Sequence, residues 1–396
     1  MISFGEHPVD ADLHAHLVDT ADELIRLTGA DLCEWNRAIE VHGMKDDRGR
    51  AAALGKAHWE GTISLREDVL TTLRDLWQRS PGPWSNEDRE RQQPSVLTVA
   101  HELIHYLVPA GERYTNGKRI YEEFPGRALE EGLTELAGRK HAHAFAGAEV
   151  RSPGVTDTRN ASSYPQFVPA AQAIVQYVSE LHGDSEDAVL NVLARENVPG
   201  KFRRLSQMVL EANGTWNQIP VAERAAACAP IINSVWGVFQ SNAEWASRRP
   251  EERPTRAPGE RSWIMGLQLV GAVERARLHA VDRYGPERVA TPVPIAAARY
   301  ERYLARKAVD FAQSSRHADV RAAAGAWMQR AIQRTREAST ELEPERPEPG
   351  QGTHHAAPEV AAVPSLAESP RPTRTRRPRQ VSVRRRPGRP DRGLDR

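Results

Sequence analysis

Apolar residues recur at helical spacing through most of the chain. Within residues 9–28, leucines and alanines follow one another at steps of three and four, which predicts an amphipathic helix. The same spacing predicts helices at 32–41, 68–78, from 87 or 94 to 107, 127–146, 165–181, 186–195, 201–212 and 221–247. Two or three more helices are expected between residues 263 and 338.

Two short segments depart from the helical period. In residues 59–65, apolar or small residues alternate with polar ones, which predicts a strand. In residues 113–121, Asn116-Gly117 lies between β-prone residues and predicts a hairpin, because both turn positions tolerate positive φ. The expected fold class is therefore α+β and predominantly α-helical, with a small antiparallel sheet packed on a pair of helices, extra helices after them and a disordered tail.

The tail differs sharply from the rest of the chain. Residues 341–396 hold ten of the 28 prolines and almost no large apolar side chains, so we expect them to be disordered. Residues 371–396 alone carry eleven arginines and two aspartates, a net +9, which leaves −8 for residues 1–370 in a chain of net charge +1. This basic segment predicts either weak contact with nucleic acid or an acidic partner, or a solubilising extension.

Composition restricts the class of protein further. Two cysteines, Cys33 and Cys228, exclude a disulfide framework and a cysteine-ligated zinc finger. The N-terminus shows no Sec signal, and no apolar stretch is long enough for a transmembrane segment. We expect a cytoplasmic protein, with export by a non-classical route left open.

The strongest chemical signal is His101-Glu102-Leu-Ile-His105. Two histidines four residues apart lie on the same face of a helix and can share one metal ion. Glu102 lies beside that metal, where it can act as general base toward a water molecule. The flanking apolar residues indicate that this helix is buried.

A catalytic metal site of this kind needs a third protein ligand and one open position. An acidic helix follows downstream, with the sequence Leu-Glu-Glu-Gly-Leu-Thr-Glu at 129–135. Its carboxylates Glu130, Glu131 and Glu135 are the candidates for the third ligand.

With HELIH followed by LEEGLTE, the chain resembles the gluzincin-type zinc metallopeptidases, and among them the compact minigluzincin-like enzymes encoded by bacteria and phages. The resemblance covers roughly residues 59–177. It implies that His101, His105 and Glu131 bind Zn²⁺, and that Glu135 hydrogen-bonds a ligand histidine. The 25 residues between His105 and Glu131 exceed the usual spacing of the large gluzincins, so the choice among the three glutamates stays open.

The resemblance also implies how a substrate binds. The strand at 59–65 corresponds to an edge strand that pairs with an extended peptide. A tyrosine ahead of a helix donates a hydrogen bond to the developing oxyanion in such enzymes. Tyr164 is the candidate here, with Tyr106, Tyr121 and His143 as alternatives.

The expected function is zinc-dependent hydrolysis of peptide bonds. Residues 1–215 would form the metallopeptidase domain and residues 216–340 a helical region that acts as a lid, regulates the enzyme or recruits substrate, before the tail at 341–396. The alternative is a catalytically inactive metallopeptidase-fold interaction module whose basic tail contacts nucleic acid or an acidic partner. The intact HELIH and EEG sequences favour the enzyme.

Overall fold

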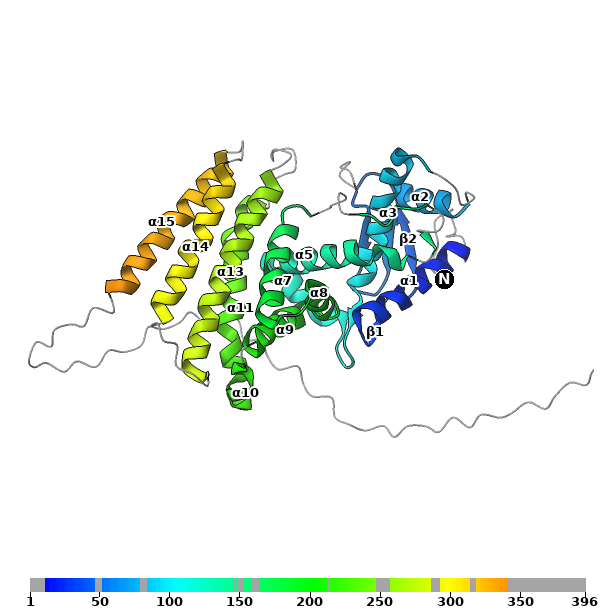
Figure 1. Cartoon of the computed structure of the whole chain (residues 1–396). Coiled ribbons are helices and arrows are strands. Elements are labelled where there is room, and N and C mark those ends of the chain that lie inside the picture. The colour runs from blue at the N-terminus through cyan, green and yellow to red at the C-terminus, as the bar shows by residue number, and fades with distance from the viewer. Residues whose placement is uncertain are drawn as a thin grey trace, which may run out of the picture. The chain divides into compact units, whose positions relative to one another are not determined.

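Helices make up most of the described chain, and its strands are short (Figure 1). The α+β, predominantly α-helical class is therefore confirmed. The predictions for the tail at 341–396 fall outside the described residues. The computed structural model describes residues 11–46, 52–78, 84–145, 147–148, 152–158, 164–212, 214–246, 257–285, 293–313 and 318–340.

The first helices follow the apolar spacing closely. The predicted helix at 9–28 is observed as α1, and the HELIH helix begins with an N-cap in which Ser85 Oγ accepts from the Asp88 backbone N–H at 3.0 Å. These elements are α1 (Ala11–Thr28), α2 (Glu67–Gln78), α3 (Asn86–Ile104), η1 (Tyr114–Gly117), α4 (Lys118–Glu122), α5 (Phe124–His141) and η2 (Ala142–Ala144).

The strands form two small sheets. In the larger sheet the order is β2-β4-β3, with β4 parallel to β2 and antiparallel to β3, so the sheet is mixed and not antiparallel as expected. The smaller sheet pairs β1 with β5. The strands are β1 (Leu32–Cys33), β2 (Ile39–His42), β3 (Gly55–Ala57), β4 (Ile63–Arg66) and β5 (Leu107–Val108).

The strand predicted at 59–65 is observed in part, but it is not an edge strand. Only Ile63–Arg66 is extended, and β4 lies in the centre of the sheet because both of its edges carry hydrogen bonds. The preceding residues form the turn between β3 and β4, where Gly61 has a φ of +90°. Within the described residues β3 has one neighbour, so β3 is the edge strand beside α3.

The helix predicted at 32–41 is wrong. The segment forms β1 and β2, separated by a turn at Asn36-Arg37. Asn36 Oδ1 accepts from the Ala38 backbone N–H at 2.8 Å, and Arg37 has a φ of +65°. This local side-chain hydrogen bond and the left-handed residue interrupt helical hydrogen bonding, which the apolar spacing alone did not reveal.

The hairpin predicted at 113–121 is also wrong. The segment forms η1 and α4. A type I′ turn requires positive φ at both central residues, but Gly117 has a φ of −80°. Both η1 and α4 pack against a later helix, α9, and this tertiary contact overrides the local turn preference.

The second half of the described chain is entirely helical. Its elements are α7 (Val168–His182), α8 (Glu186–Ala194), α9 (Val198–Glu211), α10 (Thr215–Gln218), η3 (Val221–Glu223), α11 (Arg224–Ser241), α12 (Ala243–Ala246), α13 (Ala257–Tyr284), α14 (Val293–Gln313) and α15 (Ala318–Thr340). Helices α13, α14 and α15 pack side by side, and α13 lies along α7 (Figure 1). None of the helices in the described segments has the length and apolar composition needed to cross a membrane.

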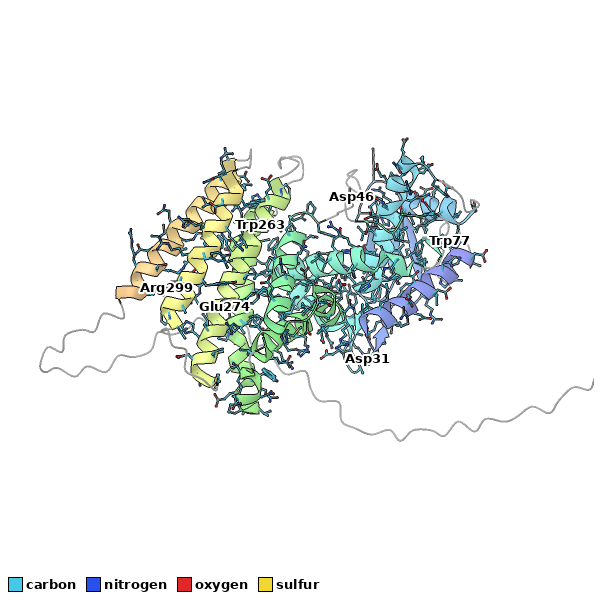
Figure 2. The ribbon with its side chains drawn as sticks, viewed as in Figure 1. Asp31, Asp46, Trp77, Trp263, Glu274 and Arg299 are labelled. Carbon is cyan, nitrogen blue, oxygen red and sulfur yellow. The ribbon has the colours of Figure 1, made fainter. Side chains whose placement is uncertain are left out.

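One apolar core runs through both halves. Helix α3 packs against β3 and α5, α5 packs against α7, and α7 packs against α13. Trp263 and Glu274 lie on α13 (Figure 2), and Glu274 accepts a hydrogen bond from Tyr177 of α7 at 2.5 Å. The described residues up to 340 belong to one compact unit. The domain boundary near residue 215 stays a prediction.

Candidate metal centre

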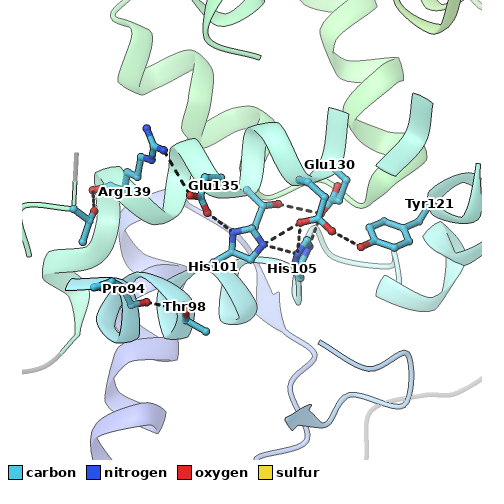
Figure 3. Close-up of polar contacts among 11 residues, drawn as sticks. Pro94, Thr98, His101, His105, Tyr121, Glu130, Glu135 and Arg139 are labelled. Carbon is cyan, nitrogen blue, oxygen red and sulfur yellow. Dashed lines mark hydrogen bonds and ion pairs between the residues drawn. The ribbon is translucent and has the colours of Figure 1, made fainter. Parts of the chain in front are cut away.

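Two crossing helices bring the predicted site residues together (Figure 3). His101 and Glu102 lie in the last turns of α3, with His105 as its C-cap, while Glu130 and Glu131 lie on α5. All are buried, none more than 7% exposed. The glycine of the EEG sequence permits close packing, because a Cβ at position 132 would lie 2.9 Å from a side-chain atom of α7.

Three lone-pair-bearing atoms converge on one point. His101 Nε2 lies 3.1 Å from His105 Nε2 and 3.1 Å from Glu131 Oε2, and His105 Nε2 lies 3.6 Å from the same oxygen. Bonds of about 2.0–2.2 Å to a tetrahedral ion separate neighbouring ligand atoms by roughly 3.3–3.6 Å. The sides of the observed triangle lie within about 0.2 Å of that range. His101, His105 and Glu131 can together hold a metal ion.

The outer nitrogens of both histidines face carboxylates. Glu135 Oε2 lies 3.0 Å from His101 Nδ1, and Glu130 Oε1 lies 2.9 Å from His105 Nδ1. An ionised carboxylate only accepts hydrogen bonds, so each Nδ1 carries a proton. In its neutral form each histidine then presents its Nε2 lone pair to the shared point. Of the three candidate glutamates, Glu131 is therefore the one directed at the histidine Nε2 pair.

The pKa values follow these contacts. Burial lowers the pKa of His105, but hydrogen bonds to Glu130 and Glu131 outweigh burial and raise it to about 9. Burial likewise lowers the pKa of His101, and its glutamate partners raise it well above its ordinary value. Burial raises the pKa of Glu130, but Lys201 and His105 bring it down to about 2. The metal-free site thus favours ionised carboxylates and protonated histidines.

Formal charge shows what kind of ion the site suits. Four buried carboxylates surround the point where the ligand atoms converge: Glu102, Glu130, Glu131 and Glu135. Two cationic side chains pair with them, since Lys201 Nζ lies 2.8 Å from Glu130 and Arg139 Nη2 lies 3.7 Å from Glu135. With neutral histidines this leaves a formal charge of −2, which a divalent cation would neutralise.

Glu102 lies between the ligand cluster and the edge strand. Burial raises its pKa, while His101 and His105 and a backbone hydrogen bond from Ala57 of β3 lower it. The fit against β3 is tight, because a Cβ at Gly55 would lie 2.9 Å from Glu102 Cγ and 3.1 Å from Oε1. The absence of a side chain at Gly55 therefore allows the carboxylate to lie directly against the strand.

The structure distinguishes the candidate oxyanion donors. The Tyr164 ring stacks on His101 with ring centroids 5.3 Å apart, and Tyr121 donates a hydrogen bond to Glu131 Oε1. Tyr106 donates to two backbone carbonyls near the β3–β4 turn, and the exposed His143 ring contacts a backbone carbonyl at the end of α5. Tyr164 and Tyr121 therefore lie at the cluster, and Tyr106 and His143 are engaged elsewhere.

Aromatic side chains continue from the cluster to a cavity. Tyr121 packs edge-on against Trp59 at 5.5 Å between ring centroids, and Trp59 stacks on Tyr114 at 4.4 Å. Trp59 and Tyr114 line a cavity of about 360 Å³, together with Glu34 and Glu60. The site thus has an aromatic wall with space next to it.

Two cationic residues at the site were missed by sequence reasoning. Arg139 follows Glu135 by one helical turn, and in the sequence nothing distinguishes it from an ordinary surface arginine. Lys201 had a signal, because it lies on the apolar stripe of α9 three residues after Val198 and four before Leu205. A lysine on the apolar face of a helix implies a buried anionic partner, but the spacing within α9 does not identify that partner.

Comparison of this chain with models of protein families, with curated proteins and with solved structures gives no match. The identification of the site therefore depends on its own residues. These are a buried triad of ligand atoms, two outer carboxylates that set the histidine tautomers, and a fourth carboxylate against an edge strand.

Proposed function

We propose that this protein is a zinc-dependent peptidase. The observation that carries the proposal is the convergence of His101 Nε2, His105 Nε2 and Glu131 Oε2 on one buried point with Glu102 beside it. Two imidazoles and one carboxylate are a ligand set that zinc takes in catalytic sites with an open fourth position. The gluzincin resemblance of HELIH and LEEGLTE agrees with this chemistry.

Zinc at this point would polarise the scissile carbonyl and lower the pKa of a water molecule toward roughly 7. Glu102 would take the proton from the attacking water at a carboxylate oxygen and transfer it to the leaving amine. Burial favours this role because it raises the pKa of Glu102. A carboxylate whose pKa lies nearer to the working pH can both accept a proton and release it again.

Tyr164 would donate a hydrogen bond to the oxygen that becomes negatively charged. Its ring is stacked on His101, and burial together with the charges of Glu131 and Glu102 raises its pKa, so the hydroxyl keeps its proton. Tyr121 donates a hydrogen bond to Glu131 Oε1, whereas the contact of the Tyr164 hydroxyl with Glu131 is one of the smaller influences on the pKa of Tyr164. The hydrogen bond from Tyr121 favours it as a residue that orients the third ligand.

The edge strand β3 offers a place for the peptide backbone. One edge of β3 pairs with β4, and its other side faces Glu102. An extended peptide that adds to β3 as a further strand would place its backbone beside the base. Strand addition reads main-chain groups, which suits a peptidase more than an enzyme for small molecules.

The test uses the full chain and Glu102→Gln. We expect about one zinc per wild-type chain and chelator-sensitive cleavage of a mixed library of quenched fluorescent peptides. Glu102→Gln should retain zinc, because Glu102 is not a ligand, and should lose cleavage because it lacks the base. Glu90→Gln, an exposed position on the same helix, is the matched control and should behave as wild type. Cleavage retained in Glu102→Gln, or a folded chain that binds no metal, would contradict the proposal.

A further inference from the structure

A buried lysine lies behind one of the two histidines. Lys201 is in the first turn of α9 and is 1% exposed. Burying an ammonium group is unfavourable unless the group is paired. Its Nζ lies 2.8 Å from Glu130 Oε2 and donates to the Glu196 carbonyl at 2.7 Å. The ammonium group is therefore held by one hydrogen bond to a backbone carbonyl and by one close ion pair with a carboxylate.

Glu130 connects this lysine to the metal site. Its other oxygen, Oε1, lies 2.9 Å from His105 Nδ1 and accepts from Thr134 Oγ1 at 3.2 Å. Because one oxygen faces Lys201 and the other faces His105, the position of the ammonium fixes the orientation of the oxygen that holds the imidazole. We propose that Lys201 is a positioning residue for the metal centre and acts through Glu130 on His105. This inference rests on the metal binding proposed above.

The start of α9 is itself firmly held. Asn197 is the N-cap, and its side chain accepts from the Gly200 backbone N–H at 2.9 Å. The same side chain donates to Glu112 Oε2 at 2.9 Å, which ties the helix to the segment after β5. Because the first turn is capped, the backbone that carries Lys201 has a defined position. Helix α9 thereby becomes part of the metal centre, although it contributes no ligand.

The second histidine has the same arrangement with a weaker outer member. His101 Nδ1 lies 3.0 Å from Glu135, whose other oxygen is 3.7 Å from Arg139 Nη2. The Arg139 side chain is 20% exposed, so solvent screens and replaces its contact more readily than that of Lys201. Each ligand histidine is thus followed by a carboxylate and then a cation. The larger effect is expected on the Lys201 side.

The test compares Lys201→Met with wild type in the full chain. Methionine has similar length and no charge, so it leaves Glu130 Oε2 buried without its ammonium. We expect the zinc Kd, measured by competition with a chromophoric chelator, to rise on the order of 10- to 100-fold. The visible spectrum of bound Co²⁺, which depends on ligand geometry, should change as well. Lys140→Met is the matched control, because this lysine of α5 is 42% exposed and pairs with Asp187.

Further variants separate the possible outcomes. Should Lys201→Met fail to fold, Glu130→Gln is compared with Glu130→Gln/Lys201→Met. Neither variant has a carboxylate at position 130, so Lys201 has nothing to orient in this background. Equal zinc affinities in this pair support action through Glu130, and a further tenfold loss in the double variant overturns it. An unchanged Kd and Co²⁺ spectrum in folded Lys201→Met overturns the inference and leaves the peptidase proposal intact. A wild-type chain that binds neither ion overturns both.

Discussion

Two buried glutamates in this protein have opposite surroundings. Glu301 of α14, 4% exposed, accepts hydrogen bonds from Arg275 Nη1 at 2.9 Å, Trp327 Nε1 at 3.1 Å and Arg334 Nε at 2.8 Å. Glu131 of α5, 3% exposed, faces two histidine Nε2 atoms and a tyrosine hydroxyl. Both carboxylates are buried and both have several partners, yet of these two clusters only that of Glu131 has a set of atoms that could hold a metal ion.

The two clusters differ in which side chains carry the hydrogen-bonding protons. Guanidinium and indole groups are donors only, so the Glu301 cluster is complete without anything further. In their neutral form the histidines at Glu131 donate outward through Nδ1, which leaves both Nε2 atoms as acceptors facing a third acceptor. A surplus of buried acceptors must be met by protons or by a metal ion. A buried carboxylate alone therefore does not distinguish this site. The surplus of buried hydrogen-bond acceptors does.

The largest effect should come from removing one acceptor of the triad. His105→Ala leaves two protein ligands, and we expect zinc content to fall from about one per chain to nearly none, with peptide cleavage lost. Metal analysis after dialysis, together with the cleavage assay, measures both. His143→Ala is the control, because this histidine is exposed and lies away from the triad. Retention of full zinc by His105→Ala would mean that the ion binds elsewhere.

The two tyrosines near the triad should separate in their effects. Tyr164→Phe removes the proposed donor to the oxyanion, so kcat should fall about 10²- to 10³-fold while zinc affinity stays the same. Tyr121→Phe removes a hydrogen bond to the ligand Glu131, so zinc affinity should fall on the order of tenfold. Steady-state kinetics at saturating zinc and a chelator titration decide between them. The reverse pattern would exchange the two roles.

The sequence predicted the parts of the site that local spacing controls. His101, Glu102 and His105 follow from helical geometry, whereas Glu131 and Glu135 follow from the resemblance of LEEGLTE on a second helix to the gluzincin pattern. The structure places all five in one buried cluster. Their chemical roles remain predictions for the experiments proposed above.

The remaining features depend on contacts between distant segments. Lys201 meets Glu130 only because α9 packs against α5, 71 positions further along the chain. The hairpin predicted around Gly117 failed for the same reason, since packing on α9 decides that conformation. Strand order is likewise non-local. β4 pairs with β2 although β3 lies between them in the sequence, and this pairing places β4 in the centre and β3 at an edge. No spacing rule within one segment contains this information.

Changes in pH should alter the stability of the metal centre through His105. In the metal-free protein the pKa of His105 is raised from 6.5 to about 9, so its contribution to stability is fully present below pH 6.5 and is lost as pH rises through about 9. We expect this loss to be on the order of 3 kcal/mol. Zinc excludes those protons, so its stabilising increment should grow over the same window. Thermal unfolding with and without zinc from pH 6 to 9.5 measures both, and a constant increment would contradict the assigned tautomers.

The smallest effect is expected at Glu301, which tests whether that cluster is purely structural. Glu301→Gln removes the charge but keeps an acceptor, and its arginine partners are about one third exposed, so solvent screens the loss. We expect the free energy of unfolding in urea to fall by about 1 kcal/mol, equally with and without zinc. Glu131→Gln should abolish the zinc-dependent increment. Near neutral pH it should also destabilise the metal-free protein, because it removes a charged partner of both histidines. If Glu301→Gln also weakened zinc binding, the two clusters would be coupled through α13 and α7. The donors and acceptors within each cluster would then no longer explain why only one of them binds zinc.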